Sequence, residues 1–441
     1  MTLHEGASPM EVIGLKLLQD VKTLHSYLDD AGLPHPSFDK GTPPVVLPNG
    51  APLEVQSARE QIMDAALRLF RLAAGPSDYL TLARTTHEDV ATFQWLWKFQ
   101  IFDIVPADGP IGYTELAAKA NVSAAHAKSI IRMAMTTGLF EELTPQQVSH
   151  SATSLYIRNS DHTRTWAAWI CDISIPAAAS MVAAQTKWPR SLSRVHTAYN
   201  VANDTELPFF QHLAQVPERK AQFEGLMKAV SFLQKFNLKH TIAGFDWASL
   251  GEATVVDVGG STGHVSIALA REFPSLKFIV QDLPEVIADA QSHLLSLPDS
   301  AALTPRIMYL PHSFLTPQPI PNAAVYFLRM ILHDWPNEEA ITILSQLVPA
   351  LGKDSRILVM DSILPDPGSV PLAKERLLRT QDLTMLQNFN AQERALEDWQ
   401  EIFGRVEGGL EIKAIRQPVE SNMAFIELAL KQEEREGEVL P

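Results

Sequence analysis

The sequence predicts an α/β protein, with a doubly wound parallel sheet in its C-terminal part and a helical N-terminal part. Two observations predict this division. From residue 252 onward, short β-rich runs alternate with helical segments, which is typical of parallel strands joined by helices. Before residue 245, apolar residues recur mainly at helical spacing. We therefore expect two domains, residues 1–245 and residues 246–441.

The composition is that of a globular enzyme. The chain has 441 residues, 46% hydrophobic and 20% charged, enough for two or three domains at ~150 residues each. Its net charge of −15 disfavours nucleic acid and anionic membranes as partners, because both attract positive surfaces. A single cysteine, Cys171, excludes a disulfide within the chain and a cysteine-based zinc site.

The first hundred residues predict helices joined by a linker. Helical spacing covers residues 9–31 and returns over 57–105, and the Pro- and Gly-rich stretch between them predicts an extended arm. The opening residues lack a basic segment followed by an apolar one, so we expect no targeting segment.

The most apolar stretch, residues 167–184, contains Asp172 and Pro176. Because a bilayer span needs ~20 mostly apolar residues, this stretch predicts a buried helix in a soluble, cytoplasmic protein.

Residues 112–160 predict a helix, a turn, a second helix and a short strand pair, which is the order of a winged helix. Such a domain can read DNA with its second helix, here near residues 123–136. That helix offers His126, Lys128 and Arg132 but is otherwise mostly Ala, Ile and Met. Because the chain is acidic, packing or dimerisation is favoured over DNA binding.

A glycine-rich turn follows the strand at residues 254–258. Glycine lets a backbone turn tightly and approach a ligand closely. The dinucleotide spacing would require Gly at Ser261 and His264, and the phosphate loop would require Lys after Gly263. Both patterns fail, which argues against a nicotinamide enzyme and a nucleoside triphosphatase.

The next strand ends at Asp282, about 20 residues beyond the last glycine, where an acid can accept hydrogen bonds from ribose hydroxyls. A glycine turn and a ribose acid without pyrophosphate spacing fit an adenosyl ligand that lacks phosphates, such as S-adenosylmethionine (SAM). Asp257, just before the turn, can attract a cationic ligand. The alternative role for Asp282 is to cap the helix that follows, and the two roles are compatible.

His333 lies between an apolar strand and a helix that starts near Pro336, which is the ligand-binding end of a strand. A neutral imidazole there is suited to act as a general base. The alternative is a buried histidine beside a helix cap. Asp361 also ends a strand, whereas Glu393 begins a helix, where an acid favours the helix dipole in any case.

Five segments carry a family resemblance: VVDVGGSTG, FIVQDLPEVI, FLRMILHDWP, ILVMDSILPDPG and NFNAQER. In this order they resemble the caffeate-type small-molecule O-methyltransferases of plants and fungi, and the long Pro-containing N-terminal region is most similar to the fungal secondary-metabolism branch. The resemblance covers essentially the whole chain. It implies a Rossmann-like SAM-binding sheet, an N-terminal winged-helix dimerisation domain, a homodimer, and methyl transfer to a small-molecule acceptor without a metal ion.

The resemblance also implies cofactor contacts. The matching positions are Gly259, Gly260, Asp282, Leu283, Ser313, Phe314 and Arg329. The two glycines would line the methionine part of SAM, Asp282 would hold the ribose, and Leu283 and Phe314 would pack near the adenine. Two of these positions depart from the family. Arg329 replaces its usual Lys, and Ser313 replaces an acid, so that contact is altered.

His333 matches the family's catalytic base, and Asp361 and Glu393 match the two acids that orient its imidazole. Such acids fix the tautomer and stabilise the imidazolium that forms. General-base help is typically worth ~10²–10⁴-fold. Asp361 stands where plant members carry Glu, and its shorter side chain leaves a longer gap to the imidazole.

Several residues stay open between function and packing. Aromatic and methionine side chains in the region where the family contacts its acceptor are Phe209, Phe210, His212, Met330 and Met385. For each of them core packing is an equal alternative. No site role is assigned to His150, His162 or Arg164.

Two rival functions remain at this stage. One is a non-methylating enzyme on the same scaffold that uses SAM only as a bound cation for a pericyclic or dehydration reaction. The changes at Ser313 and Arg329 keep it open, and the intact His333-Asp334-Trp335 sequence counts against it. The other, a DNA-binding regulator, is disfavoured by the acidic charge.

Overall fold

The computed structural model describes residues 6–431, without the side chains of residues 231 and 232. The chain forms two compact units. The first is Met1–Ala179, Leu213–Ala229 and Asp366–Leu378, and the second is Ser180–His212, Val230–Pro365 and Arg379–Pro441. Residues 1–5 and 432–441, which the expected domains include, lie outside the described residues. The division at residue 245 stays a prediction.

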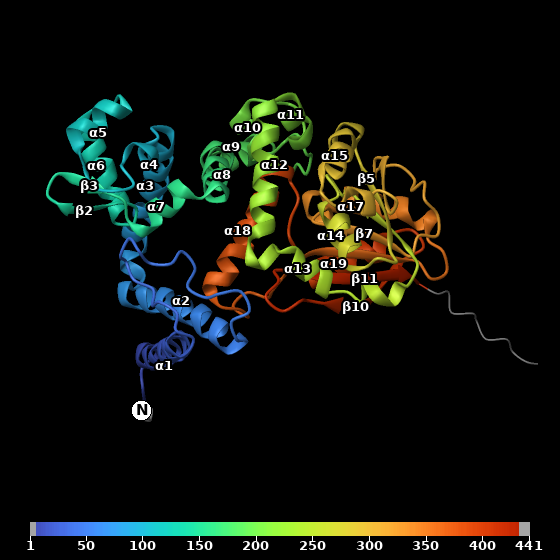
Figure 1. Ribbon diagram of the computed structural model, residues 1–441, viewed down its shortest axis with the longest axis horizontal. Helices are drawn as coiled ribbons and strands as arrows, with labels where there is room; N and C mark the ends of the chain where they lie inside the picture. The colour runs from blue at the N-terminus through green and yellow to red at the C-terminus, as the bar shows by residue number, and fades with distance from the viewer. Residues whose placement is uncertain (1–5, 432–441) are drawn as a thin grey trace, which may run out of the picture. The chain divides into compact units, whose positions relative to one another are not determined.

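The first unit begins with two helices that lie side by side, α1 (Pro9–Asp30) and α2 (Leu53–Ala74) (Figure 1). The start of α1 is fixed by a capping box, in which Ser8 and Glu11 each accept a backbone N–H of the other. The segment between the helices has no regular structure, as its Pro and Gly content predicts. It contributes Leu47 and Ala51 to a small core with Leu28 and Val55.

The helix, turn, helix and strand pair that the sequence predicts over residues 112–160 are present as α5 (Tyr113–Ala120), α6 (Ala124–Met135), β2 (Glu141–Thr144) and β3 (Gln147–Ser149). They follow α3 (Tyr79–Lys98), α4 (Ile101–Ile104) and β1 (Ile111–Gly112). The assignment of this part as a winged-helix dimerisation domain stays a prediction. The strands pair antiparallel in the order β1-β3-β2. Arg132, a candidate base-reading residue on α6, is bound at both ends of the Glu142 carboxylate on β2, at 2.9 and 2.7 Å. Arg132 therefore already has an ion-pair partner within the fold.

After α7 (Ala152–Asn159), a long helix runs through α8 (Asp161–Trp169), a π-helical turn (Ile170–Ser174) and α9 (Ile175–Lys187). Its 27 residues are long and apolar enough to cross a membrane, and 33% of the most apolar window is buried. Core helices of soluble proteins have the same length and hydropathy. Asp172, at its middle, accepts hydrogen bonds from Gln222 on its carboxylate and from Arg219 on its carbonyl. Both donors lie on α12 (Pro217–Phe232).

The second unit is built on the expected sheet, and every strand inferred from the sequence is present. The strands are β4 (Thr254–Val258), β5 (Lys277–Asp282), β6 (Ile307–Pro311), β7 (Val325–Arg329), β8 (Arg356–Leu364), β10 (Leu410–Arg416) and β11 (Met423–Leu430). Their order is β10-β11-β8-β7-β4-β5-β6, with β4 to β8 parallel and β10 and β11 antiparallel. The two-residue β9 (Arg394–Ala395) pairs with the end of β8.

Helices cover both faces of this sheet: α14 (His264–Glu272) and α15 (Pro284–Ser296) pack on one face, and α17 (Asn337–Leu347) and α19 (Leu396–Arg405) pack on the other (Figure 1). The second unit also contains α10 (Ala198–Asn203), α13 (Leu238–Ala243) and α16 (Ser300–Leu303), whereas α11 (Phe209–Gln215) and α18 (Leu372–Phe389) have residues in both units. Neighbouring strand residues belong to opposite cores. Val255 and Phe327 pack with α14 and α15, whereas Val256 and Tyr326 pack with α17 and α19. Strands buried on both faces therefore read as continuous apolar runs.

The strand order reverses between β4 and β7. From β4 the chain continues to β5 and β6 on one side, and from β7 it continues to β8 on the other. In doubly wound sheets, ligands bind beyond the carboxyl ends of the strands at this reversal. The glycine turn after β4 and the segment with His333 after β7 both begin there.

Candidate active site

The glycine turn has no room for side chains at its first two positions. Gly259 has a φ of +72°, and both glycines donate backbone N–H bonds to the Gln281 carbonyl, at 2.8 and 3.0 Å. A Cβ added to Gly259 would lie 2.7 Å from Ile331, and one added to Gly260 would lie 2.6 Å from the Asp257 carboxyl carbon. The bare backbone is therefore a structural requirement of this turn.

Asp282 is held by the turn that it faces. Its Oδ2 accepts the Ser261 N–H and its Oδ1 accepts the Leu283 N–H, both at 2.8 Å. Burial raises the pKa of Asp282, and these two backbone donors oppose the rise. Each carboxylate oxygen keeps a second acceptor position. The cap expected as an alternative role is absent, because the N-cap of α15 is Leu283, and no side chain bonds the helix start.

A buried carboxylate and a buried guanidinium lie behind the turn. Asp257 accepts the Ser266 hydroxyl at 2.6 Å, and burial raises its pKa to about 6. Arg329 donates to the Phe236 carbonyl at 3.0 Å. Burial lowers the pKa of Arg329 to about 10, against the opposing charges of Asp257 and Asp361. Its buried Nε has no hydrogen-bond partner among the described residues.

Ser313 and Phe314 follow β6. The Ser313 hydroxyl accepts the Leu315 N–H at 3.4 Å, and its carbonyl accepts the Thr316 hydroxyl at 2.7 Å, which makes a local turn. The Phe314 ring meets the Trp335 ring edge-on, with centroids 5.3 Å apart. This contact ties the segment after β6 to the segment after β7.

His333 lies on a single 3-10 turn, Leu332–Asp334, and is 4% exposed. Its Nδ1 is 2.7 Å from Oε1 of Glu393, and its Nε2 is 3.6 Å from Oδ1 of Asp334. Because a carboxylate only accepts hydrogen bonds, the short contact places the proton on Nδ1. The lone pair of a neutral imidazole is then on Nε2.

Asp361 does not make the hydrogen bond that its match to the family implies. It is fully buried, and neither of its carboxylate oxygens has a hydrogen-bond partner among the described residues. Burial raises the pKa of Asp361 to about 7, and the charge of His333 opposes the rise. Glu393 alone bonds the imidazole, while Asp361 acts on it through its charge.

The acids reverse the effect of burial on His333. Burial by itself lowers the pKa of an imidazole, but the charges of Glu393, Asp334 and Asp361 raise the pKa of His333 to about 10. The imidazolium is therefore strongly stabilised in this site.

Arg394, which no pattern in the sequence singles out, supports the turn that carries His333. Its fully buried guanidinium donates to the Leu332 carbonyl at 2.7 Å and to the Trp335 carbonyl at 2.6 Å. It also donates twice to Oδ1 of Asn337, at 3.1 and 3.0 Å. The only signal for this role is that Arg394 directly follows Glu393.

Glu393 is fixed from α18 as well. The Gln381 amide donates to Oε1 of Glu393 at 2.6 Å, and the Glu393 N–H donates to the Asp382 carboxylate at 3.0 Å. Gln381 thus holds the carboxylate that bonds His333, and Asp382 holds the backbone of the same residue.

The aromatic candidates for the acceptor pocket pack on one another. Phe209 is 1% exposed, and its ring lies 5.2 Å from Phe210 and 4.8 Å from Phe389. The Tyr199 hydroxyl and Nδ1 of His212 are 2.7 Å apart. Phe209 is a core residue by this packing.

The other residues singled out in the sequence differ in burial and in their contacts. Met385 is buried, and Met330 follows β7 with a φ of +54°. His150 is fully buried in contact with Ser154 and Val105, and Arg164 pairs with Asp103. His162 is exposed.

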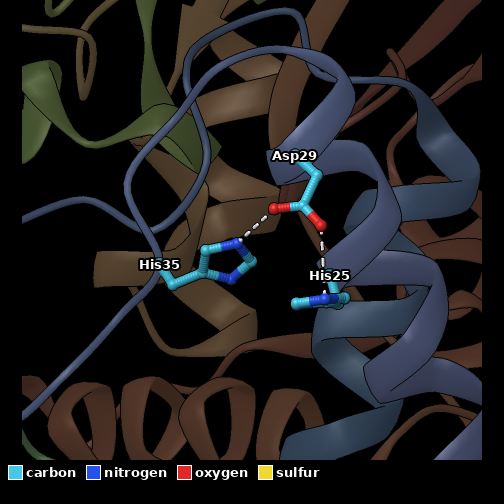
Figure 2. Close-up of side chains that lie close together, drawn as sticks. All are labelled: His25, Asp29 and His35. Carbon is cyan, nitrogen blue, oxygen red and sulfur yellow. Dashed lines mark hydrogen bonds and ion pairs between the residues drawn. The ribbon is translucent and has the colours of Figure 1, made fainter.

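One group of side chains among the described residues has the chemistry and spacing of metal ligands, although the sequence predicts no metal site. It comprises His25 and Asp29 at the end of α1 and His35 in the segment that follows (Figure 2). All three are exposed. The Asp29 carboxylate contacts Nε2 of His35 at 2.8 Å and Nε2 of His25 at 3.2 Å. These contacts explain the grouping without an ion, and the group belongs to the first unit, not to the unit that holds His333.

Two parts of the chain match known protein families. Residues 192–408 match the O-methyltransferase domain family. Residues 16–74, which include α2 and the greater part of α1, match a family described as the N-terminal domain of the trypacidin cluster transcriptional coactivator tpcD.

Curated fungal relatives match along their whole length. O-methyltransferase aoiF of Aspergillus oryzae is 49% identical over 421 residues, which is 96% of this chain and 100% of the relative. O-methyltransferase aurJ of Gibberella zeae is 42% identical over 435 residues, which is 97% of this chain and 99% of the relative.

Solved structures share the fold. LepI in complex with SAM has a TM-score of 0.68 at 24% identity and covers 95% of this chain and 100% of LepI. A structure described as a pericyclic reaction enzyme has a TM-score of 0.67, also at 24% identity, with the same coverage of both chains. At this identity the likeness extends to the fold alone.

The cramped glycine turn leads to a first prediction. Gly260→Ala is expected to weaken SAM binding about tenfold or more, because the new methyl group would displace Asp257 or the turn itself. Isothermal titration with SAM measures the effect. Gly404→Ala on α19, where a Cβ meets nothing within 4 Å, is the matched control. A dissociation constant that stays unchanged in Gly260→Ala contradicts the assignment.

Proposed function

Since the chain belongs to the SAM-dependent O-methyltransferase family of fungal secondary metabolism, we propose that it methylates a phenolic hydroxyl of a small natural product, with His333 as the general base. The observation that carries the role of His333 is its 2.7 Å contact with Glu393 at a buried position after β7. This contact turns Nε2, the proton-accepting atom, away from the acid that orients the ring.

The residues around the glycine turn fit the cofactor. Gly259 and Gly260 would line its methionine part, where no side chain has room. Asp282 would accept the ribose hydroxyls with the acceptor positions that its backbone bonds leave open. When bound, SAM supplies an electrophilic methyl group on a positively charged sulfur.

Four further side chains complete the proposed cofactor site. Leu283 and Phe314 would pack on the adenine. Leu283 is 43% exposed beside Asp282 and therefore open to a planar ring. The buried, unpartnered Nε of Arg329 would donate to the ligand. Ser313 would contribute less than an acid, since its hydroxyl already takes part in a local turn.

The chain's own part in the reaction is to move a proton. Nε2 of His333 takes the proton of the acceptor hydroxyl, and the Nδ1–H remains bonded to Glu393. The negative charges of Glu393, Asp334 and Asp361 stabilise the imidazolium that results. The oxygen of the acceptor keeps the electron pair of the broken O–H bond. That pair would form the new bond to the methyl carbon that SAM supplies, and the electron pair of the carbon–sulfur bond that breaks would stay on the sulfur.

The acids match the base to a phenol. Proton transfer from a phenol with a pKa of ~10 to an ordinary imidazole is uphill by about 5 kcal/mol. The neighbouring acids raise the pKa of His333, so the same transfer is less uphill in this site. A phenol is more acidic than an aliphatic hydroxyl, so it gives up its proton to this base more readily.

The pericyclase alternative has no observation in its favour. The structure described as a pericyclic reaction enzyme shares only the fold with this chain. The His333–Glu393 pair has a use in methyl transfer to a hydroxyl, because such a transfer needs a base.

We propose further that the protein is a cytoplasmic homodimer assembled through its helical N-terminal domain, residues 1–245. The support is the family resemblance, together with large apolar side chains that the first unit leaves exposed. Among these are Phe70 at 57%, Tyr79 at 70% and Leu80 at 78% exposure. Light scattering after size-exclusion chromatography tests the dimer, and a monomer mass contradicts it.

The test of the proposed function uses SAM with a labelled methyl group and a fungal small-molecule extract. The wild type is expected to transfer label to an extracted product. His333→Ala is expected to lose at least ~10²-fold in turnover while it still binds SAM, because only the base is removed. Asp282→Ala is expected to weaken SAM binding instead. Turnover that survives in His333→Ala removes this residue as the base, and an unchanged dissociation constant in Asp282→Ala removes the ribose contact.

The raised pKa of His333 predicts the pH profile. A base must be unprotonated, so kcat/KM is expected to rise with pH through the alkaline range. Glu393→Gln removes a negative charge that holds the proton on His333, so the rise is expected to move to lower pH. The plateau is expected to fall by up to ~10²–10⁴-fold, since the tautomer is no longer fixed.

The pH profile is compared at a single acceptor, so the titration of the acceptor itself cancels between variants. Glu338→Gln is the matched control, because Glu338 is exposed and pairs with Arg405 on the surface. A rise at the same pH in wild type and Glu393→Gln contradicts the coupling of the two groups.

Methyl transfer is expected to be independent of metal ions. The resemblance implies this, and the proposed chemistry takes its base from His333. Extensive dialysis against EDTA should leave initial rates within about twofold, as should a double variant His25→Ala/His35→Ala that removes two members of the N-terminal group. Rates that fall with EDTA and return with Mg²⁺ or Zn²⁺ contradict this prediction.

A further inference from the structure

Arg194 lies in the second unit, in the segment between α9 and α10. Its guanidinium carbon is 3.7 Å from the centre of the Trp335 ring, which is a close cation–π contact. Trp335 is buried and follows His333 by two residues. One face of the guanidinium is therefore covered, while its N–H donors point out from the edge of the plane.

No acceptor for these donors is present among the described residues. Arg194 makes no hydrogen bond or ion pair there, and its Nε is buried. Arginine has five N–H donors, and a half-buried guanidinium without an acceptor costs free energy. Arg394, which contacts the same turn, shows the ordinary arrangement, with its donors on two backbone carbonyls and an amide oxygen.

Arg194 is also within range of the charges of two acids near the proposed base. The charges of Asp334 and Glu339 act on Arg194 against the lowering of its pKa by burial. Asp334 in turn is 3.6 Å from Nε2 of His333. A molecule that brings a hydroxyl to Nε2 can thus present a second oxygen to the open edge of the guanidinium.

We propose that Arg194, stacked on Trp335, is the binding subsite for a second oxygen of the acceptor, a carbonyl conjugated with the hydroxyl that His333 deprotonates. The acceptor class is a hydroxyaryl ketone. This inference rests on the proposed function, because it assigns the acceptor side of that same site.

The chemistry gives the contact a catalytic use. When the hydroxyl proton moves to Nε2 of His333, the negative charge that remains is shared with the conjugated carbonyl oxygen. A hydrogen bond from a cation to that oxygen strengthens as the charge develops, and such interactions accelerate reactions. No bond to Arg194 forms or breaks.

The test uses two phenols of the same size, 2-hydroxyacetophenone and 2-ethylphenol, which differ in the carbonyl oxygen. Their dissociation constants are measured by isothermal titration with protein saturated with S-adenosylhomocysteine, so no turnover is needed. The wild type is expected to bind the ketone about 10–100-fold more tightly. Arg194→Met should lose this preference and keep its affinity for 2-ethylphenol, and Arg194→Lys should retain part of it.

The matched control is Arg416→Met, because Arg416 also lies over an aromatic ring, that of Phe245, but near Glu427. It should keep the preference of the wild type. S-adenosylhomocysteine binding reports folding of each variant, and Arg194→Gln replaces Arg194→Met if the latter does not fold.

Three outcomes overturn the subsite: equal affinity of the wild type for both phenols, a preference that survives in Arg194→Met, and no binding of either phenol at millimolar concentration. Failure of the proposed function is a separate result. A ketone preference that depends on Arg194, with no methyl transfer to any acceptor, supports the subsite and contradicts the methyltransferase. Methyl transfer without the preference does the reverse.

Discussion

Two adjacent residues of opposite charge hold the proposed base in place. Glu393 bonds the imidazole of His333, and Arg394 bonds the carbonyls of the residues on either side of the turn that carries it. Both are buried, and their hydrogen bonds offset part of the cost of burying a charge, although Oε2 of Glu393 has no partner among the described residues. Because β9 pairs with the end of β8, Glu393 and Arg394 lie at the carboxyl edge of the sheet. The geometry of the site depends on that placement.

Burial and the neighbouring charges shift the pKa of His333 in opposite directions. Burial alone would keep the imidazole neutral and make it a weak base, whereas three neighbouring acids raise its pKa to about 10. Asp361 contributes through charge alone, and its carboxylate oxygens have no hydrogen-bond partner among the described residues. The charge of Asp361 also acts on Arg329, so this acid affects both the proposed base and a residue of the proposed cofactor site.

Local pattern was enough to predict the sheet, the glycine turn and the position of His333. Strands such as TVVDV and RILVM are buried on both faces, so their composition alone distinguishes them from helices. The role of Arg394 could not be predicted, because its partners lie about 60 residues earlier in the chain. The missing bond of Asp361 was anticipated only as a longer gap, since it depends on how far β8 lies from the turn after β7.

Arg394 and Arg194 both contact the segment around His333. They differ in whether their hydrogen-bond donors have acceptors within the protein. The donors of Arg394 bond acceptors within the chain, so Arg394 stabilises the fold and needs no ligand. Arg194 covers the Trp335 ring on the same turn yet has no acceptor among the described residues. A folded chain pairs nearly all its buried polar groups. An arginine held in place by stacking but left without an acceptor is therefore suited to a ligand that supplies the oxygen.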